Sequence, residues 1–399
     1  MKPTVITKLS LMMLFEYFIW SAWYVTMNPY MKANIGATDV QIGAAYSALA
    51  IATIISPFFV GMIADRFFAA QRLMGILHII GGALLFLATE IENPNIFYWV
   101  ILAYSLLYMP TIALSNSIAF HQMSDPGKQF PWIRVFGTVG WIVAGIMIST
   151  LGVDETPFTF HMAGIASVIL GLFSFALPHT PPKGKDAGAT ASSVLGTEAF
   201  VLFKNKPYLI FFIAAILVCI PLSFYYSQTS GFLTELGMNN VAGTMAFGQF
   251  SEAIFILAIP FLFNSIGVKR MIIIGMIAWV LRYVMFAYGN MDSAAWMLYA
   301  GIILHGICYD FFFVTGYMYT EKKAGEKIKN SAQGLFTVAT YGVGMVIGTA
   351  FSGFVADNYK TDAGHDWTSI WYVPAGIAVF VLIYFVLFFK EEKQIKQAV

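Results

Sequence analysis

Stretches of about 20 mostly apolar residues recur along almost the whole chain and are separated by short charged or Pro/Gly/Asn-rich segments. A helix needs about that many residues to cross the hydrocarbon core of a bilayer. Charged residues make up only 11% of the 399 residues and hydrophobic residues 59%, well away from the balance of a soluble domain. We therefore expect an all-α integral membrane protein.

Twelve such windows can be marked when charges and Pro/Gly/Asn clusters set their edges. They lie near residues 6–30, 41–63, 72–90, 97–120, 131–151, 158–178, 208–232, 241–264, 271–289, 296–319, 331–355 and 368–389. The first window is too long for the apolar region of a signal peptide and lacks a small-residue cleavage site, so it is expected to stay as a membrane helix.

The basic residues outside the windows fall almost entirely on one side of the predicted membrane. Of the 22 lysines and arginines, Arg134 and Arg282 lie within windows, Lys32 and Lys360 lie on one side, and the other 18 lie opposite. Cytoplasmic loops carry an excess of Lys and Arg. The asymmetry therefore predicts that both termini are cytoplasmic.

The longest polar segment, HTPPKGKDAGATASSVLGTEAF at 179–200, separates six windows from six. The halves also echo each other, since SPFFVGMIADR (56–66) resembles IPFLFNSIGVKR (259–270). Parallel repeats of six helices build one large class of transporters, with the substrate site between the halves. The expected domains are an N-terminal bundle of six helices at 1–178, a central cytoplasmic loop at 179–206 and a C-terminal bundle of six helices at 207–399.

The turn after the second window carries a motif. GMIADRFFAAQR at 61–72 has nearly the spacing of the cytoplasmic loop motif of the major facilitator superfamily, which the chain resembles here. Glycine permits close helix approach, and the aspartate can pair with a basic group and so latch one conformation; an ordinary helix-ending turn is the alternative. The predicted latch residues are Gly61, Asp65, Arg66 and Arg72. The expected fold is therefore two six-helix bundles of the major facilitator type.

Five charged residues lie well inside the windows: Glu16, Arg134, Glu252, Arg282 and Asp310. Each costs about 2.5 to 3.5 kcal/mol at the centre of a membrane helix, so each must be paired, neutralised or exposed to water. Arg282 and Asp310 stand at similar depth on neighbouring windows, and we predict a structural ion pair between them in preference to a role in proton transport.

Glu252 is the only charge between Glu235 and Lys269, and Gln249 shares its helix face at i−3. Burial favours the protonated form of a carboxylate, so we expect Glu252 to bind the coupling proton and Gln249 to contact a polar ligand. A satisfied polar helix contact is the alternative. Glu16 is expected to be either a second proton site or a satisfied polar group, and the sequence favours neither.

Two further sets share helix faces. Arg134, Thr138 and Trp141 form an i, i+4, i+7 stripe that offers fixed donors, a hydroxyl and an aromatic face to an oxygen-rich ligand. The alternative for the arginine is a side chain that snorkels to the cytoplasm. His305 and Tyr309 are i, i+4 neighbours that we expect to face the cavity, unless they are ordinary packing residues.

The chain resembles the nucleoside:proton symporters of bacterial inner membranes, a family of the major facilitator superfamily. The resemblance is carried by WSAW, GAAYSALAI, ADRFFAA, YMPTIALSNSIAF, FPWIRVFGTVG, LFKNKP, SEAIFILAIPF, AWVLRYVMFAYG, YDFFF and SAQGLF. It implies proton-driven uptake of nucleosides held between the two halves. The positions that match the family's substrate site are Arg134, Thr138, Gln249 and Glu252, and Trp141 keeps an aromatic ring there.

The chain also departs from the family pattern. Ser223 and Tyr226 are also predicted to bind the substrate, at positions where the resemblance leads us to expect amide side chains. It leads us to expect Tyr and Phe where His305 and Tyr309 stand, and an uncharged amide at Glu16. These departures leave the base preference open, and a proton-coupled sugar or nucleobase carrier of the same fold is the alternative function.

The remaining expectations concern partners. We expect a nucleoside and a proton to be carried across the lipid bilayer by a monomer, with no cofactor, metal or nucleic acid. An enzyme is not expected, because the chain has no HExxH, GxSxG or Walker A motif and no metal-ligand cluster.

Overall fold

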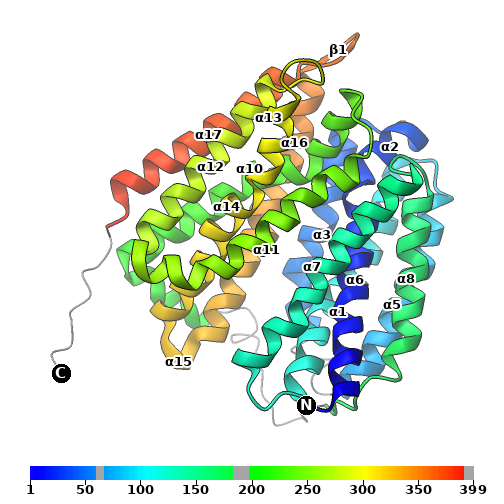
Figure 1. Cartoon of the computed structure of the whole chain (residues 1–399), viewed down its shortest axis with the longest axis vertical. Helices are drawn as coiled ribbons and strands as arrows, with labels where there is room; N and C mark the ends of the chain where they lie inside the picture. Colours follow the sequence, from blue (N-terminus) through cyan, green and yellow to red (C-terminus); the bar gives the residue numbers. More distant parts are fainter. Residues whose placement is uncertain (60–66, 183–196, 391–399) are drawn as a thin grey trace.

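The computed structural model describes residues 1–59, 67–182 and 197–390. Nearly all of them are helical, and Figure 1 shows the helices as two groups that stand side by side. The first group contains α1 (Pro3–Tyr24), α2 (Met27–Ile35), α3 (Asp39–Phe59), α5 (Ala70–Thr89), α6 (Pro94–His121), α7 (Pro126–Leu151) and α8 (Phe158–Ser174).

The second group begins with the 3-10 helix η2 (Thr197–Lys204) and ends with the long helix α17 (Trp367–Phe388). Between them lie α10 (Lys206–Glu235), α11 (Val241–Ile266), α12 (Val268–Tyr288), α13 (Ala295–Ile303), α14 (His305–Tyr309), the π-helix η3 (Asp310–Val314), α15 (Thr315–Thr337), the π-helix η4 (Val338–Gly344), α16 (Met345–Asn358) and a hairpin of β1 (Lys360–Thr361) and β2 (Gly364–His365).

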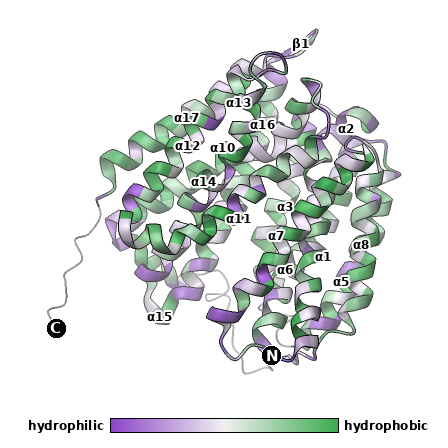
Figure 2. Ribbon diagram, viewed as in Figure 1, coloured by the Kyte–Doolittle hydropathy of each residue, from purple (hydrophilic) through white to green (hydrophobic). Residues whose placement is uncertain are grey.

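The apolar windows become membrane helices. Within the described residues, eleven helices are long and apolar enough to cross a membrane, and the shorter apolar helix Phe158–Ser174 occupies the remaining window. Figure 2 shows hydrophobic residues along most of these helices and hydrophilic residues at α15 and around β1. The predicted all-α membrane fold of twelve helices in two bundles is confirmed.

The N-termini of three helices show how the sequence sets their boundaries. Asn93, Asp125 and Asn205 each accept a hydrogen bond from a backbone N–H of the first turn, and each helix has a proline at its first or second position. These side chains satisfy donors that have no partner within the helix, and proline there loses no hydrogen bond.

Two windows differ from the expected helices. The first window is divided at Val25 and Thr26 into α1 and α2, and Pro29 in the first turn of α2 favours a new helix start there. The segment after the tenth window, expected to be a loop, is part of helix α15, which runs from Thr315 to Thr337. The helix is broken at Gly325, where φ is +65° and ψ is 178°. Glycine adopts this conformation at little cost.

The predicted domain boundaries, 1–178, 179–206 and 207–399, stay predictions. Helix η2 (Thr197–Lys204) lies inside the segment expected to be the central loop, and residues 183–196 of that segment lie outside the described residues.

The two bundles meet closely at the end of the molecule that carries α2 and the β1–β2 hairpin, hereafter the hairpin end (Figure 1). There the Asn28 side chain donates to the Ser227 carbonyl at 2.5 Å, and the Asp154 carboxylate accepts from the Ala242 backbone N–H at 2.7 Å. The N-terminus and α15 lie at the opposite end (Figure 1). The contacts described at the hairpin end close that side of the interface between the bundles.

Candidate functional site

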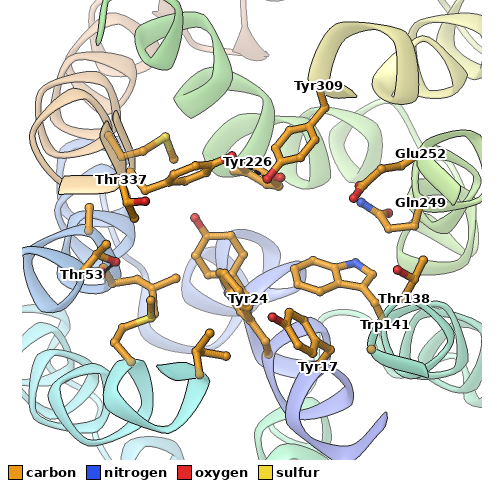
Figure 3. Close-up of a pocket in the computed structure, with 18 of the residues that line it drawn as sticks. Tyr17, Tyr24, Thr53, Thr138, Trp141, Tyr226, Gln249, Glu252, Tyr309 and Thr337 are labelled. Atoms are coloured by element: carbon orange, nitrogen blue, oxygen red, sulfur yellow. Dashed lines mark hydrogen bonds between the residues drawn. The ribbon is translucent and has the colours of Figure 1, made fainter. Parts of the chain in front are cut away.

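A cavity of about 310 Å³ lies between the two bundles, and both contribute to its wall (Figure 3). The first bundle supplies Tyr17, Trp20, Tyr24, Tyr46, Leu49, Ala50, Thr53, Met109, Ile112, Arg134, Gly137, Thr138 and Trp141. The second supplies Tyr226, Gln249, Glu252, Tyr309, Tyr317, Thr337, Tyr341 and Met345. A pocket with a largely aromatic wall and a few convergent polar groups suits a small, partly polar ligand.

Polar groups predicted from two helix faces meet in one part of this cavity. Figure 3 shows Glu252 and Gln249 of α11 facing Thr138 and Trp141 of α7. The Arg134 guanidinium also lines the cavity and lies 3.9 Å from the centre of the Tyr17 ring. This cation–π contact fixes the cation on the cavity side instead of leaving it free to snorkel away.

Tyrosines from both bundles cross the middle of the cavity (Figure 3). The rings of Tyr24 and Tyr226 are 5.8 Å apart and join the two bundles, while the Tyr341 hydroxyl donates to the Tyr309 hydroxyl at 2.5 Å. A π-helix follows Tyr309 directly, and another contains Tyr341. Such local changes of helix register often occur at functional sites. The aromatic surface offers a stacking face for a planar ring.

His305 does not line the cavity, which corrects the expectation that it faces the ligand. Its ring is completely buried and is stacked on Tyr225 at 4.8 Å and on Tyr309 at 5.5 Å. Its Nε2 atom lies 3.8 Å from Glu252 Oε2, too far for a hydrogen bond. His305 therefore stands behind the aromatic wall and supports Tyr309.

Ser223 is also absent from the cavity wall, in contrast to the prediction. Its hydroxyl is buried and donates to the Cys219 carbonyl at 2.7 Å, beside Met345 of α16. The side chain therefore packs towards α16. Tyr226, three residues later on the same helix, is the predicted residue of this pair that reaches the cavity.

Glu16 lies outside the cavity and belongs to a buried network within the first bundle. Its carboxylate accepts from Thr111 Oγ1 at 2.6 Å and lies 3.0 Å from His78 Nε2. The other ring nitrogen of His78 is 3.1 Å from the hydroxyl of Ser167. Because Glu16 is fully buried and has these partners, the geometry supports the alternative of a satisfied polar group.

The predicted ion pair of Arg282 and Asp310 is not formed. The Arg282 Nε donates to the Gly301 carbonyl at 3.0 Å, and the guanidinium lies 4.1 Å from the Tyr225 ring centre. Both Asp310 oxygens are buried without a hydrogen-bond partner among the described residues. The prediction assumed a uniform α-helix, whereas α14 changes to the π-helix η3 at Asp310 and the direction of the side chain changes with it.

The predicted latch motif cannot be followed through the structure. Gly61, Asp65 and Arg66 lie outside the described residues, and Arg72 is exposed at the start of α5. The conformational latch at this turn stays a prediction.

Several lining residues were not predicted, among them Tyr17, Tyr24, Thr53 and Tyr341. The first two, with Trp20, follow an i, i+3, i+7 spacing that places them on one face of α1, so a helix-face analysis could have found them. Thr53 and Tyr341 stand in apolar helices without a charged neighbour, and no comparable pattern marks them.

Comparison with known proteins supports the resemblance to nucleoside:proton symporters over nearly the whole chain. The family described as Nucleoside H+ symporter matches residues 3–394. The chain is 38% identical over 406 aligned positions to the putative nucleoside transporter YegT of Escherichia coli (strain K12), with 98% of this chain and 95% of the relative covered. The xanthosine permease of the same organism is 35% identical over 398 positions, with 96% and 95% covered.

A solved structure agrees with these relatives. The crystal structure of the nucleoside transporter NupG superposes with a TM-score of 0.90 at 32% identity, and the match covers 98% of this chain and 100% of that one.

Proposed function

Because this chain belongs to the nucleoside H⁺ symporter family, we propose that the cavity between its bundles is the nucleoside site of a proton-coupled importer. One observation carries this proposal. The four residues that match the family's substrate site, Arg134, Thr138, Gln249 and Glu252, line a single cavity although they come from helices in different bundles.

The chemistry of the cavity suits both parts of a nucleoside. The base is flat and stacks on aromatic rings, for which Trp141 and Tyr309 provide faces. The ribose hydroxyls and base edges need hydrogen-bond partners, which Arg134, Thr138 and Gln249 supply. A free sugar could use these polar groups but has no base to stack against the rings.

Glu252 is the residue proposed to carry the coupling proton. It lies within a membrane-spanning helix, yet its side chain is 25% exposed towards the cavity. A carboxylate at that depth is stable when it is protonated, paired or hydrated. It can therefore take up a proton when water enters the cavity and keep it when the cavity closes. Arg134, on the same cavity wall, is the cation that can attract the deprotonated form.

We propose that the N-terminus and α15 face the cytoplasm and the hairpin end faces the outside of the bacterial inner membrane. The strong excess of Lys and Arg expected on the side of the termini supports this orientation. The contacts at the hairpin end then close the cavity to the outside, as one step of alternating access requires. A monomer is proposed, because described residues of one chain line the cavity from both bundles.

Binding of uridine, adenosine and a hexose to the purified protein tests the substrate assignment. Trp141→Ala removes one aromatic face and should weaken nucleosides more than the hexose. Gln249→Ala leaves a ligand group without its partner, which costs about 1 to 3 kcal/mol, or roughly five- to 150-fold in affinity. Wild-type binding of the hexose but of neither nucleoside would move the sugar-carrier alternative into first place.

A further inference from the structure

A second polar cluster joins the two bundles at the hairpin end. It consists of Lys32 on α2, Asp39 at the start of α3, Glu235 at the end of α10 and His365 on β2. The first two residues belong to the first bundle and the last two to the second. None of the four lines the cavity that contains Glu252.

His365 connects carboxylates from the two bundles. Its Nε2 atom is 2.9 Å from Asp39 Oδ2, and its Nδ1 atom is 2.6 Å from Glu235 Oε2. Ionised carboxylates only accept hydrogen bonds, and both nitrogens of an imidazole can donate only when the ring is protonated. Lys32 Nζ completes the cluster at 3.0 Å from Asp39 Oδ1. Two cations then balance two anions.

The cluster is well shielded at its centre. The side chains of Asp39 and His365 are 2% and 5% exposed, whereas those of Lys32 and Glu235 are 25% and 29% exposed at the rim. Loss of one charge from a buried hydrogen-bonded set leaves its partners uncompensated. The attraction between Asp39 of the first bundle and His365 of the second therefore depends on the charge of His365.

Two other charged residues lie near His365 but are not part of the cluster of Lys32, Asp39, Glu235 and His365. Lys360 is its neighbour across the hairpin, and Asp366 uses its carboxylate to accept from the Ser369 backbone N–H and hydroxyl. The uncharged ring of Trp367 also lies close to His365, at 5.0 Å.

We propose that His365 is a proton-operated latch that closes the two bundles on the outer side of the transporter. When the ring loses its proton, one nitrogen presents a lone pair to a carboxylate, and that side of the bridge becomes repulsive. A purely structural ion pair would hold the bundles together equally over the pH range in which histidine titrates. The proposal rests on the alternation between open and closed states in the proposed function.

The direction of the pH effect follows from the cluster. Burial of the His365 ring lowers its pKa, but hydrogen bonds with Asp39 and Glu235 more than offset this and leave the pKa above the ordinary value of histidine, although the charge of Lys32 opposes the rise. The closed state is therefore fully stabilised below the ordinary histidine pKa and loses this stabilisation as pH rises through the raised pKa. Each pH unit between the pKa values in the closed and open states changes the closed-to-open ratio up to about tenfold.

Distance measurements between spin labels test the latch in the full-length protein. Labels on cysteines introduced at the exposed positions Ala33 and Asn239, one in each bundle, report separation at the hairpin end. The buried Cys219 and Cys308 stay in place, and the protein without introduced cysteines provides the labelling blank. Spectra are recorded without substrate between pH 5 and 9, so the result does not depend on which molecule is transported.

The wild type should shift from short to longer distances as pH rises, and His365→Gln should lose this response. Glu235→Gln should move the midpoint to lower pH, because one of the two carboxylates that raise the pKa is gone. His161→Gln is the matched control, since His161 bonds Thr89 within the first bundle, and it should respond like the wild type. A wild type without a pH response, or an undiminished response in His365→Gln, would overturn the latch.

Discussion

Gly43 of α3 lies against the backbone of α16, so the smallest possible substitution tests whether the bundles separate at this contact. A methyl group added at Gly43 would lie 2.5 Å from the Thr349 carbonyl oxygen and 3.0 Å from the Gly353 Cα atom. Both neighbours are backbone atoms, which cannot rotate away as a side chain could. Since α3 and α16 belong to different bundles, we expect Gly43→Ala to be accommodated by opening of the hairpin end.

The size of the effect follows from the overlap. Ordinary contact begins near 3.4 Å, so the two helices must separate by about 0.9 Å to accept the methyl group. Overpacking of this kind typically costs about 1 to 3 kcal/mol in the packed state. If the open state is free of the clash, the closed-to-open ratio falls roughly five- to 150-fold.

Gly376→Ala is the matched control for this experiment. Gly376 also lies within a helix, but an added methyl group there meets nothing within 4 Å. Both variants gain similar helix propensity, about 1 kcal/mol, so that contribution does not distinguish them. With the label pair at Ala33 and Asn239, Gly43→Ala should show the longer distances and Gly376→Ala the wild-type distances.

Two results would contradict an opening of the bundles at this contact. A folded Gly43→Ala protein with the wild-type distance distribution would mean that the bundles do not separate along this contact. A Gly43→Ala protein that fails to fold, beside a folded Gly376→Ala protein, would mean that the contact holds the fold together instead of one conformation.

Two further predictions concern the buried network around Glu16 and the cavity wall at Tyr341. His78→Leu should lower the melting temperature in detergent, because the buried Glu16 carboxylate loses a partner at a cost of about 1 to 3 kcal/mol. Adding Glu16→Gln to the His78→Leu protein should recover part of the loss. An unchanged melting temperature in His78→Leu would contradict the network. Tyr341→Phe removes the hydrogen bond that orients the Tyr309 hydroxyl and should weaken uridine binding roughly two- to tenfold, whereas unaltered binding would remove Tyr341 from substrate recognition.

The membrane helices could be predicted from the sequence because each must present about 20 apolar residues to lipid. Their interruptions were harder to predict. Pro29 was a visible signal for the start of α2, and Gly325 for the break in α15. The change from α14 to the π-helix at Asp310 has no comparable signal, since Asp310–Val314 contains no proline or glycine.

The same distinction applies to the site. Helix-face analysis brought Arg134, Thr138 and Trp141 together because α7 is continuous across those positions. The same spacing did place His305 and Tyr309 together, since their rings stack at 5.5 Å, but it could not show that only Tyr309 lines the cavity. For the Arg282–Asp310 pair it assumed 100° per residue, whereas the helix type changes at Asp310.

Partners that are distant in sequence could not be found at all by local spacing. Glu16 and His78 are 62 residues apart, and Asp39 and His365 are 326 residues apart. Only the folded structure shows that these side chains meet.

Glu252→Gln in proteoliposomes tests most directly whether Glu252 couples the proton to transport. Glutamine resembles the protonated carboxyl group in shape and charge but cannot release a proton. If Glu252 carries the coupling proton, an imposed pH gradient should no longer drive accumulation of uridine by this variant, while exchange of labelled for unlabelled uridine should be partly retained. Accumulation at the wild-type level by Glu252→Gln would contradict the assignment of the coupling proton to Glu252.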